Sequence, residues 1–327
     1  MLFPLLSGAH HSHGEFSGGA VEIQGEIVTI VWRNPHPALT LRVTDTNGQQ
    51  SLWRIQVLGN VNGLNRSGIT GDQFQVGKEV TLTGQLSSYR EGLILADQAK
   101  FSEGDVIQLG PVGTLGAVAY AKETPDTKSN PDPIDNTPSF FRVWTVVSRT
   151  RNFELPLRDH AHIAKQAWDP VVDDQQRNCS PMGMPGAMMS PHPIEFQQQG
   201  NNVILRLEEW DGVRKIKMSK DAQTTPPSAS SLGNSVGHWD GRTLVVTTDT
   251  INYRYLDEFG TPKSESVRVL EKFTLSEDGQ YLDWDALVTD PDTFTEPFVL
   301  ATARWQWFPG ETLQSYDCEE TDDLLDP

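Results

Sequence analysis

Short β-strand signals follow one another along almost the whole of this 327-residue sequence. In its first third, β-branched or alternating segments separated by turn pairs such as Asn47-Gly48 and Glu91-Gly92 cover residues 25–32, 38–44, 51–57, 79–85 and 93–101. Five strands within about ninety residues are typical of a small closed barrel. We therefore predict a five-stranded barrel with an OB-like topology.

Strand signals resume after residue 140. Turns such as Asp240-Gly241 and Asp278-Gly279 join eight candidate strands at residues 141–149, 202–210, 213–218, 235–239, 243–248, 266–274, 281–289 and 298–308. Only residues 157–168 have the composition of a helix. We predict a lipocalin-like antiparallel β-barrel of about eight strands, a size that encloses one small-ligand cavity. The expected fold class is all-β.

A proline-rich polar segment separates the two predicted barrels. Residues 123–138 have no hydrophobic period, which indicates a linker. The OB-like domain is then expected at residues 10–122 and the lipocalin-like domain at residues 139–327. Residues 1–9 combine a short apolar run with Ser7-Gly8-Ala9, as the end of a cleaved export signal does. The alternative is an unprocessed cytosolic N-terminus with chance histidines.

Charge and cysteine content restrict the partners and the compartment. A formal net charge of −18 disfavours binding to nucleic acid or anionic membranes, whose phosphates would be repelled. No apolar run is long enough to span a bilayer, so we do not expect an integral membrane protein. A neutral, hydrophobic or cationic partner is favoured, metal ions included. The two distant cysteines, Cys179 and Cys318, predict one structural disulfide and hence a periplasmic or secreted protein.

Four of the eight histidines precede the predicted linker: His10, His11, His13 and His36. Cleavage after Ala9 would leave a free α-amine on His10, and an amine with two or three imidazoles suits copper(II). Prolines on both sides of His36 stiffen its backbone. We predict a site for copper or another transition metal at His10, His11 and His36. The alternative for His36 is a turn residue that caps the barrel mouth.

Residues 179–192 contain four of the six methionines: Met182, Met184, Met188 and Met189. Their thioethers are soft ligands for copper(I), which suggests a second copper site. Methionine also fills irregular apolar gaps. We favour the packing role, in a loop that closes the mouth of the second barrel and is anchored by a Cys179–Cys318 disulfide.

The strands of the second predicted barrel carry aromatic and charged residues that are candidates to line its cavity: Trp144, Trp210, Arg214, His238, Trp239, Arg268, Glu271, Trp284 and Trp305. Beside Glu271 or Glu265 in an apolar barrel, His238 would do general acid–base work or orient a ligand by hydrogen bonds. The alternative is a hydrogen-bonded structural histidine.

Both halves resemble bacterial families that have no assigned reaction. Ala9-His10-His11-Ser12, the Trp32-x-Asn34-Pro35-His36 turn and Gly84 resemble a family of small exported domains whose mature chains begin at the histidine pair. The second half resembles a lipocalin-like family through Cys179-x-Pro181-x-Gly183-Met184-Pro185, residues 233–246, Ser264-Glu265, Asp290-Pro291 and Tyr316-x-Cys318-x-Glu320. The resemblance implies a small β-barrel followed by a lipocalin-like domain of unknown function.

These observations lead to one expected function and two alternatives. The expected protein is an exported, periplasmic two-domain binding protein with a copper site in its first domain and a hydrophobic small molecule in its second barrel. The first alternative is an isomerase, cyclase or hydrolase that acts on a lipophilic metabolite with His238 and a nearby carboxylate. The second alternative is a structural or adaptor module in which neither site is used.

Overall fold

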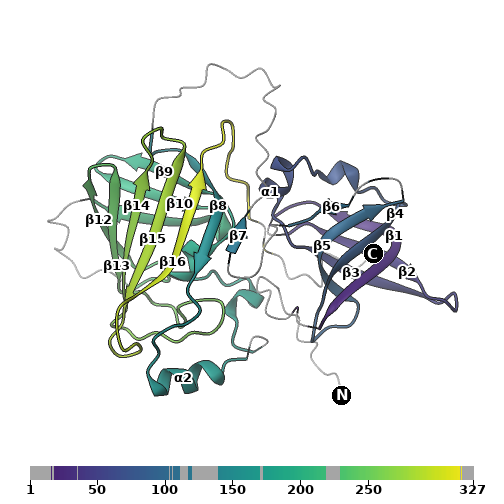
Figure 1. The fold of residues 1–327 in the computed structure, drawn as a ribbon, viewed down its shortest axis with the longest axis horizontal. Helices are drawn as coiled ribbons and strands as arrows, with labels where there is room; N and C mark the ends of the chain where they lie inside the picture. The colour runs from purple at the N-terminus through teal and green to yellow at the C-terminus, as the bar shows by residue number, and fades with distance from the viewer. Residues whose placement is uncertain are drawn as a thin grey trace.

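The computed structural model describes residues 16, 18–34, 36–102, 104, 106–110, 117–119, 139–169, 172–218, 229–316 and 318. The fold is all-β, as predicted, and consists of two closed barrels that lie side by side (Figure 1). The predicted signal peptide at residues 1–9, the predicted linker at residues 123–138, and His10, His11 and His13 lie outside the described residues.

The N-terminal barrel has the OB-like topology that the sequence predicts. Its strands are β1 (Ala20–Val31), β2 (Ala38–Thr44), β3 (Gln50–Val57), β4 (Glu79–Leu86) and β5 (Leu93–Phe101), in the order β3-β2-β1-β4-β5. A parallel pairing between β3 and β5 closes the barrel, and β6 (Ile107–Gln108) extends the sheet beyond β5. Between β3 and β4 lie α1 (Val61–Arg66) and the single turn η2 (Gly71–Gln73), neither of which the sequence predicts.

The C-terminal barrel has nine strands, which β16 closes by pairing with β8. They are β8 (Val143–Arg151), β9 (Ile194–Gln199), β10 (Asn202–Leu207), β11 (Gly212–Lys217), β12 (Asn234–Asp240), β13 (Thr243–Asp249), β14 (Arg268–Leu275), β15 (Tyr281–Thr289) and β16 (Phe298–Gln306). Neighbouring strands are antiparallel except β11 and β12. The strand absent from the prediction is β9, which has only two buried apolar side chains, Ile194 and Phe196, before three exposed glutamines.

Two further elements belong to this half of the chain. The strand β7 (Ala117–Ala119) falls in the range expected for the first domain but pairs with β8 of the second barrel. The helix α2 (Asp159–Gln166) lies within the predicted helical segment. None of the helices in the described part of the chain is long and apolar enough to cross a bilayer.

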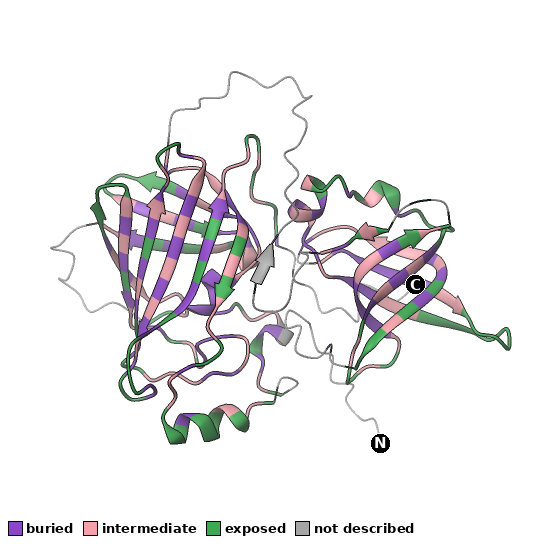
Figure 2. Cartoon of the chain, in the orientation of Figure 1, coloured by how far each residue is buried: buried purple, intermediate pink, exposed green. Residues whose placement is uncertain are grey.

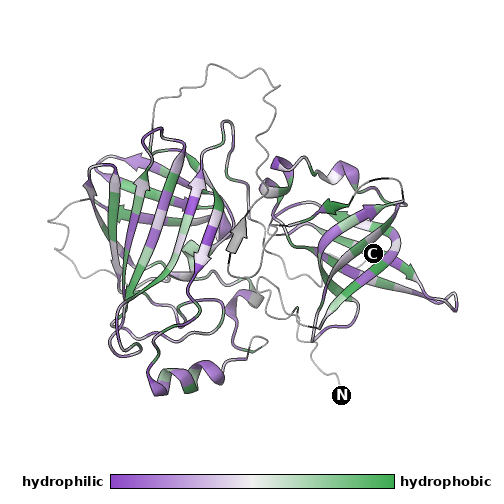
Figure 3. Cartoon of the chain, in the orientation of Figure 1, coloured by the Kyte–Doolittle hydropathy of each residue, from purple (hydrophilic) through white to green (hydrophobic). Residues whose placement is uncertain are grey.

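The second barrel is filled by its own side chains. Buried and more exposed residues alternate along β14, β15 and β16, and the buried set is largely apolar (Figures 2 and 3). The interior holds Phe196, Phe273 and the tryptophans Trp144, Trp284 and Trp305, each at most 2% exposed. The three tryptophans that we expected around an open cavity are therefore core residues.

The methionine-rich loop packs against the same core. Met182, Met184, Met188 and Met189 are all at most 5% exposed, the last two within the single turn η4 (Gly186–Met189). This agrees with the packing role predicted for them. The predicted disulfide between Cys179 and Cys318 is present, with Cα atoms 5.8 Å apart, and it joins this loop to the C-terminal segment of the chain.

Candidate functional site

A buried carboxylate, Glu208, joins the two domains. It follows the last residue of β10 and is 1% exposed. Its Oε1 accepts a hydrogen bond from Asn34 Nδ2 at 2.9 Å and lies 3.1 Å from His192 Nδ1. Its Oε2 accepts from Asn62 Nδ2 at 2.6 Å and from the backbone N–H of Gln314 at 2.8 Å. Both carboxylate oxygens thus bind groups from the first domain and from the second.

The Trp-x-Asn-Pro-His turn of the first domain supplies part of this junction. Asn34 is buried, forms a β-bridge with Tyr316, and its Oδ1 accepts from the backbone N–H of Val61 at the start of α1. Asn60, which caps α1 by accepting from the Gly63 N–H, also donates to the carbonyl of Pro191 at 3.3 Å. The turn that we expected to orient a metal ligand therefore contributes to the domain interface.

The C-terminal segment covers the same junction. Arg66 at the end of α1 forms an ion pair with Glu311, and its guanidinium lies 5.3 Å from the centre of the Phe308 ring. Burial raises the pKa of Glu311, although the charge of Arg66 opposes that change. Residues 308–316 thereby connect the second barrel to the surface of the first.

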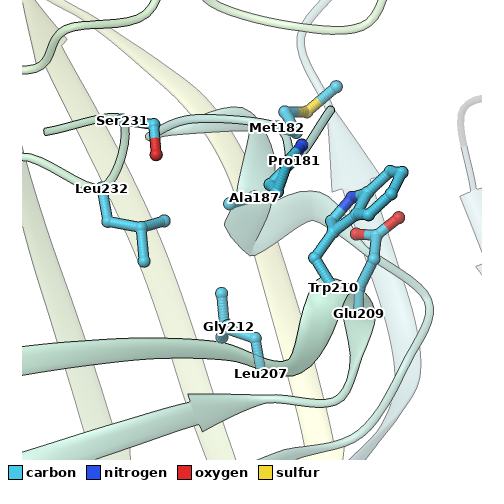
Figure 4. Close-up of a pocket in the computed structure, with 9 residues that line it drawn as sticks. All are labelled: Pro181, Met182, Ala187, Leu207, Glu209, Trp210, Gly212, Ser231 and Leu232. Atoms are coloured by element: carbon cyan, nitrogen blue, oxygen red, sulfur yellow. The ribbon is translucent and has the colours of Figure 1, made fainter. Parts of the chain in front are cut away.

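The residue after Glu208 faces a small pocket of about 170 Å³ at one end of the second barrel. Three segments surround it: the methionine-rich loop, the β10–β11 hairpin and residues 231–232 (Figure 4). The wall is mainly apolar, with one carboxylate, and is formed by Pro181, Met182, Ala187, Leu207, Glu209, Trp210, Gly212, Ser231 and Leu232.

Glu209 has an unusual electrostatic environment. Burial raises its pKa, and the charge of Glu258 acts in the same direction. His192, a hydrogen bond from the Ser190 side chain and Arg149 oppose that rise. A carboxyl group in a mainly apolar wall is the kind of group that orients a ligand or exchanges a proton with it.

Two tyrosines at this end of the barrel have raised pKa values. Burial raises the pKa of Tyr253, and the charges of Asp174 and Glu209 raise it further. Burial likewise raises the pKa of Tyr316, with added contributions from Glu209 and Glu208. Both tyrosines are therefore shielded from water and lie near carboxylates.

The hairpin that carries Glu209 has a strained backbone. Its tip is the turn η5 (Glu209–Asp211), in which Trp210 has φ 63° and ψ 15° and Asp211 has φ 48°. Left-handed conformations cost non-glycine residues of order 1–3 kcal/mol each. The hydrogen bonds of Glu208, and the Trp210 ring at 5.0 Å from the Tyr316 ring, hold this tip in place.

Two predicted cavity residues form a closed network inside the barrel instead. Arg214 forms an ion pair with Glu271, and both are at most 2% exposed. The guanidinium also donates to Ser235 Oγ at 2.8 Å and to Thr248 Oγ1 at 2.6 Å, while Trp284 Nε1 donates to Glu271 Oε1 at 3.2 Å. These groups satisfy one another, as buried charges must.

The interior acid–base pair expected at His238 is not formed. His238 lies opposite Val245 in the sheet. The adjacent residue, Gly237, lies opposite Val246, which in turn lies opposite Glu271, and these three residues are on the buried face. Because side chains alternate between the two faces of a strand, His238 points outward and is exposed. Glu265 and Arg268 are also exposed, and Trp239 is 42% exposed. Of the predicted ligand-binding residues, Trp210 alone lines the pocket.

Of the three predicted metal ligands, the described part of the chain includes His36 alone. His36 is half-buried in the turn before β2. Among the residues that the structure describes, no group of three or more His, Cys, Asp or Glu side chains is placed to hold a metal ion. His10 and His11 lie outside those residues.

The sequence did not indicate that Asn34, His192, Glu208 and Glu209 would come together in one site. The one signal was two adjacent carboxylates beside a tryptophan in the turn Glu208-Glu209-Trp210-Asp211-Gly212. Such a turn is ordinarily exposed, and nothing in its sequence indicates that it lies against another domain.

The fold and the site define an all-β protein of two barrels, with a small pocket beside a polar interdomain junction. Residues 4–93 match the model of a family of unknown function (DUF6152). No curated protein sequence matches the chain significantly. One similar solved structure is the dimeric N-terminal domain of PriB protein from Thermoanaerobacter tencongensis, at 19% sequence identity over 26% of this chain and 97% of that chain. Its TM-score of 0.20 supports no conclusion about this chain.

Proposed function

We propose that this chain is an exported two-domain binding protein that holds a small, mainly apolar molecule in the pocket of its second barrel. The observation that carries the proposal is the pocket itself, about 170 Å³ in volume and walled by apolar side chains with few polar groups. An engineered apolar cavity of about 150 Å³ binds benzene, so the pocket suits a ligand of that size. The Cys179–Cys318 disulfide supports export, because such bonds persist in oxidising compartments.

The location differs from the one expected. We predicted a ligand among the barrel tryptophans, but Trp284 and Trp305 pack against each other and Trp144 belongs to the same buried core. The pocket lies at the end of the barrel, between the methionine-rich loop and the β10–β11 hairpin. Few polar groups in an apolar concave wall are typical of small-molecule sites.

Filling the pocket tests this proposal. Ligand-observed NMR and calorimetry with toluene, benzyl alcohol and benzylamine should detect binding of at least one probe to the oxidised full chain. Leu232→Trp places a large side chain in the pocket wall and should abolish that binding. Val213→Trp is the matched control, because Val213 lies beside the hairpin tip but is 58% exposed and outside the wall. Absence of binding by every probe, or binding that persists in Leu232→Trp, contradicts the proposal.

We also propose the predicted copper site at His10, His11 and His36. The supporting observation is that Phe16 packs with Leu58, whose neighbour Val57 donates to the carbonyl of Pro37 at 2.8 Å. Phe16 therefore lies close to the segment that follows the His36 turn. The six residues from His10 to Phe16 are long enough to span about 20 Å when extended.

Copper titrations test this second proposal. Protein with a free α-amine at His10 should bind copper(II) much more tightly than protein that retains residues 1–9, and His36→Ala should weaken the binding. His160→Ala, in α2 of the second domain, is the matched control and should change nothing. Equal affinities for all four proteins contradict the proposal.

A further inference from the structure

We infer that the pocket of the second barrel selects a cationic ligand: a small organic ammonium ion whose apolar body is about the size of benzene. The inference rests on the proposed function, because it names the chemical class of the molecule that the pocket holds. It follows from the position of one carboxylate in an otherwise apolar wall, and from the charges behind that wall.

Glu209 is the one charged side chain in the wall of the pocket. The other wall groups are apolar except for the Ser231 hydroxyl and the Trp210 indole. Figure 4 shows the Glu209 carboxylate and the Trp210 ring on the same side of the space, across from Leu232. A carboxylate attracts an ammonium group, and an indole face attracts it as well through the ring quadrupole. The remaining wall accepts the apolar body.

The charges behind the wall act in the same direction. Glu208 is buried next to Glu209 in the sequence, and the charge of Glu258, which also pairs with Arg151, acts on Glu209 in the same direction as burial. Burial raises the pKa of Glu209, so its charged form is disfavoured unless a nearby positive charge compensates for the lost hydration. A ligand cation supplies that compensation, whereas a ligand anion is repelled.

Two positive groups act on Glu209, and one of them is shared with a second carboxylate. The charges of His192 and Arg149 both lower the pKa of Glu209, but the Nδ1 of His192 also lies 3.1 Å from Glu208 Oε1, so that imidazole interacts with a second carboxylate. The whole chain carries a formal charge of −18, which attracts cations over longer distances as well.

Three probes that share a phenyl ring and differ in head-group charge test the inference: benzylammonium, benzyl alcohol and benzoate, each titrated near neutral pH into the oxidised full chain. Benzylammonium should bind at least about tenfold more tightly than benzyl alcohol, a difference of about 1.4 kcal/mol, and benzoate should bind most weakly. This comparison is made on the unmodified protein, so it does not depend on whether a variant folds.

Glu209→Gln should remove the preference for benzylammonium while benzyl alcohol still binds. Asp211→Asn is the matched control, since it removes the same charge from an exposed side chain on the same turn and should keep the preference within about twofold. If no probe binds, both the proposed function and this inference fail. If benzyl alcohol or benzoate binds as tightly as benzylammonium, or if Glu209→Gln keeps the preference, the pocket binds small molecules but this inference fails.

Discussion

Replacing Glu208 by glutamine tests whether the interdomain junction holds the hairpin that carries the pocket. The change keeps the shape of the side chain and removes its charge. In the wild type, Oε2 accepts from Asn62 and from the Gln314 backbone N–H, while Oε1 accepts from Asn34 and contacts His192. A glutamine offers one oxygen and one NH2 group, so it satisfies one of these two sides only.

The geometry decides which side is lost. If the NH2 group of the glutamine took the Oε2 position, it would face two N–H donors, those of Asn62 and the Gln314 backbone. At the Oε1 position it faces only one donor, Asn34, because the His192 Nδ1 can accept a hydrogen bond in its other tautomer. The NH2 group therefore takes the Oε1 position. The Asn34 side-chain amide cannot flip to compensate, because its Oδ1 already accepts a hydrogen bond from the Val61 N–H. The variant therefore loses the Asn34 bond, leaves a buried donor unsatisfied and weakens the remaining bonds. The expected cost is about 2–4 kcal/mol, since hydrogen bonds to charged groups contribute about 1.5–3 kcal/mol each.

Hydrogen–deuterium exchange gives the appropriate measurement, because it reports local opening in a chain of two domains. Peptides that cover residues 205–216 and 307–316 should exchange about 30- to 700-fold faster in Glu208→Gln, which is the expected cost expressed as a ratio. Glu195→Gln is the control, because it removes a carboxylate of the same barrel that pairs with the half-exposed Arg206, and it should cost about 0.5 kcal/mol. Equal exchange in the two variants would refute the reasoning.

Three further changes test the second barrel. Cys179→Ser removes a crosslink between residues 139 apart and should lower the free energy of unfolding by roughly 4 to 5 kcal/mol at most, so an unchanged urea midpoint under oxidising conditions speaks against it. Glu271→Gln leaves the buried Arg214 charge unpaired and should cost about 3–5 kcal/mol in the same assay, whereas a cost below about 1 kcal/mol would mean that water reaches that charge. Burial alone would raise the pKa of Asp290, but hydrogen bonds from Ser264 and Thr293 outweigh it and lower that pKa. The stability that this lowered pKa provides is present above about pH 4 and is lost as the pH falls through the lowered value. Below about pH 4, the melting temperature of Asp290→Asn should therefore depend less on pH than that of the wild type. An equal decrease in both proteins would contradict the assignment.

The strand positions were largely predictable because apolar residues repeat with the period of a strand. The segments 38–44, 93–101 and 281–289 match β2, β5 and β15 at both ends, and the other predicted segments overlap real strands. β9 was missed because Gln197-Gln198-Gln199 shows no alternation, and these glutamines are exposed on a hairpin with β10.

Which side chains of a strand point into the barrel was less predictable than where the strand lies in the sequence. In β12 the inward residues are Ser235 and Gly237, while Val236 and His238 lie on the outward face. Hydropathy alone suggests the opposite arrangement. The interior requires a hydroxyl at 235 to accept from Arg214, and a Cβ on Gly237 would lie 2.8 Å from Ile216 Cγ2, so close packing and a buried charge decide the face.

Local patterns in the sequence determined that this protein is all-β, that it forms two barrels, that one disulfide joins Cys179 to Cys318 and that the methionine-rich loop packs. All of these depend on residue period, turn chemistry or composition. The candidate site depends on contacts between distant residues: Glu208 meets Asn34 across 174 positions and Asn62 across 146. Only the docking of the two domains brings these donors to one carboxylate, because burial of a charge is tolerated only where partners converge on it.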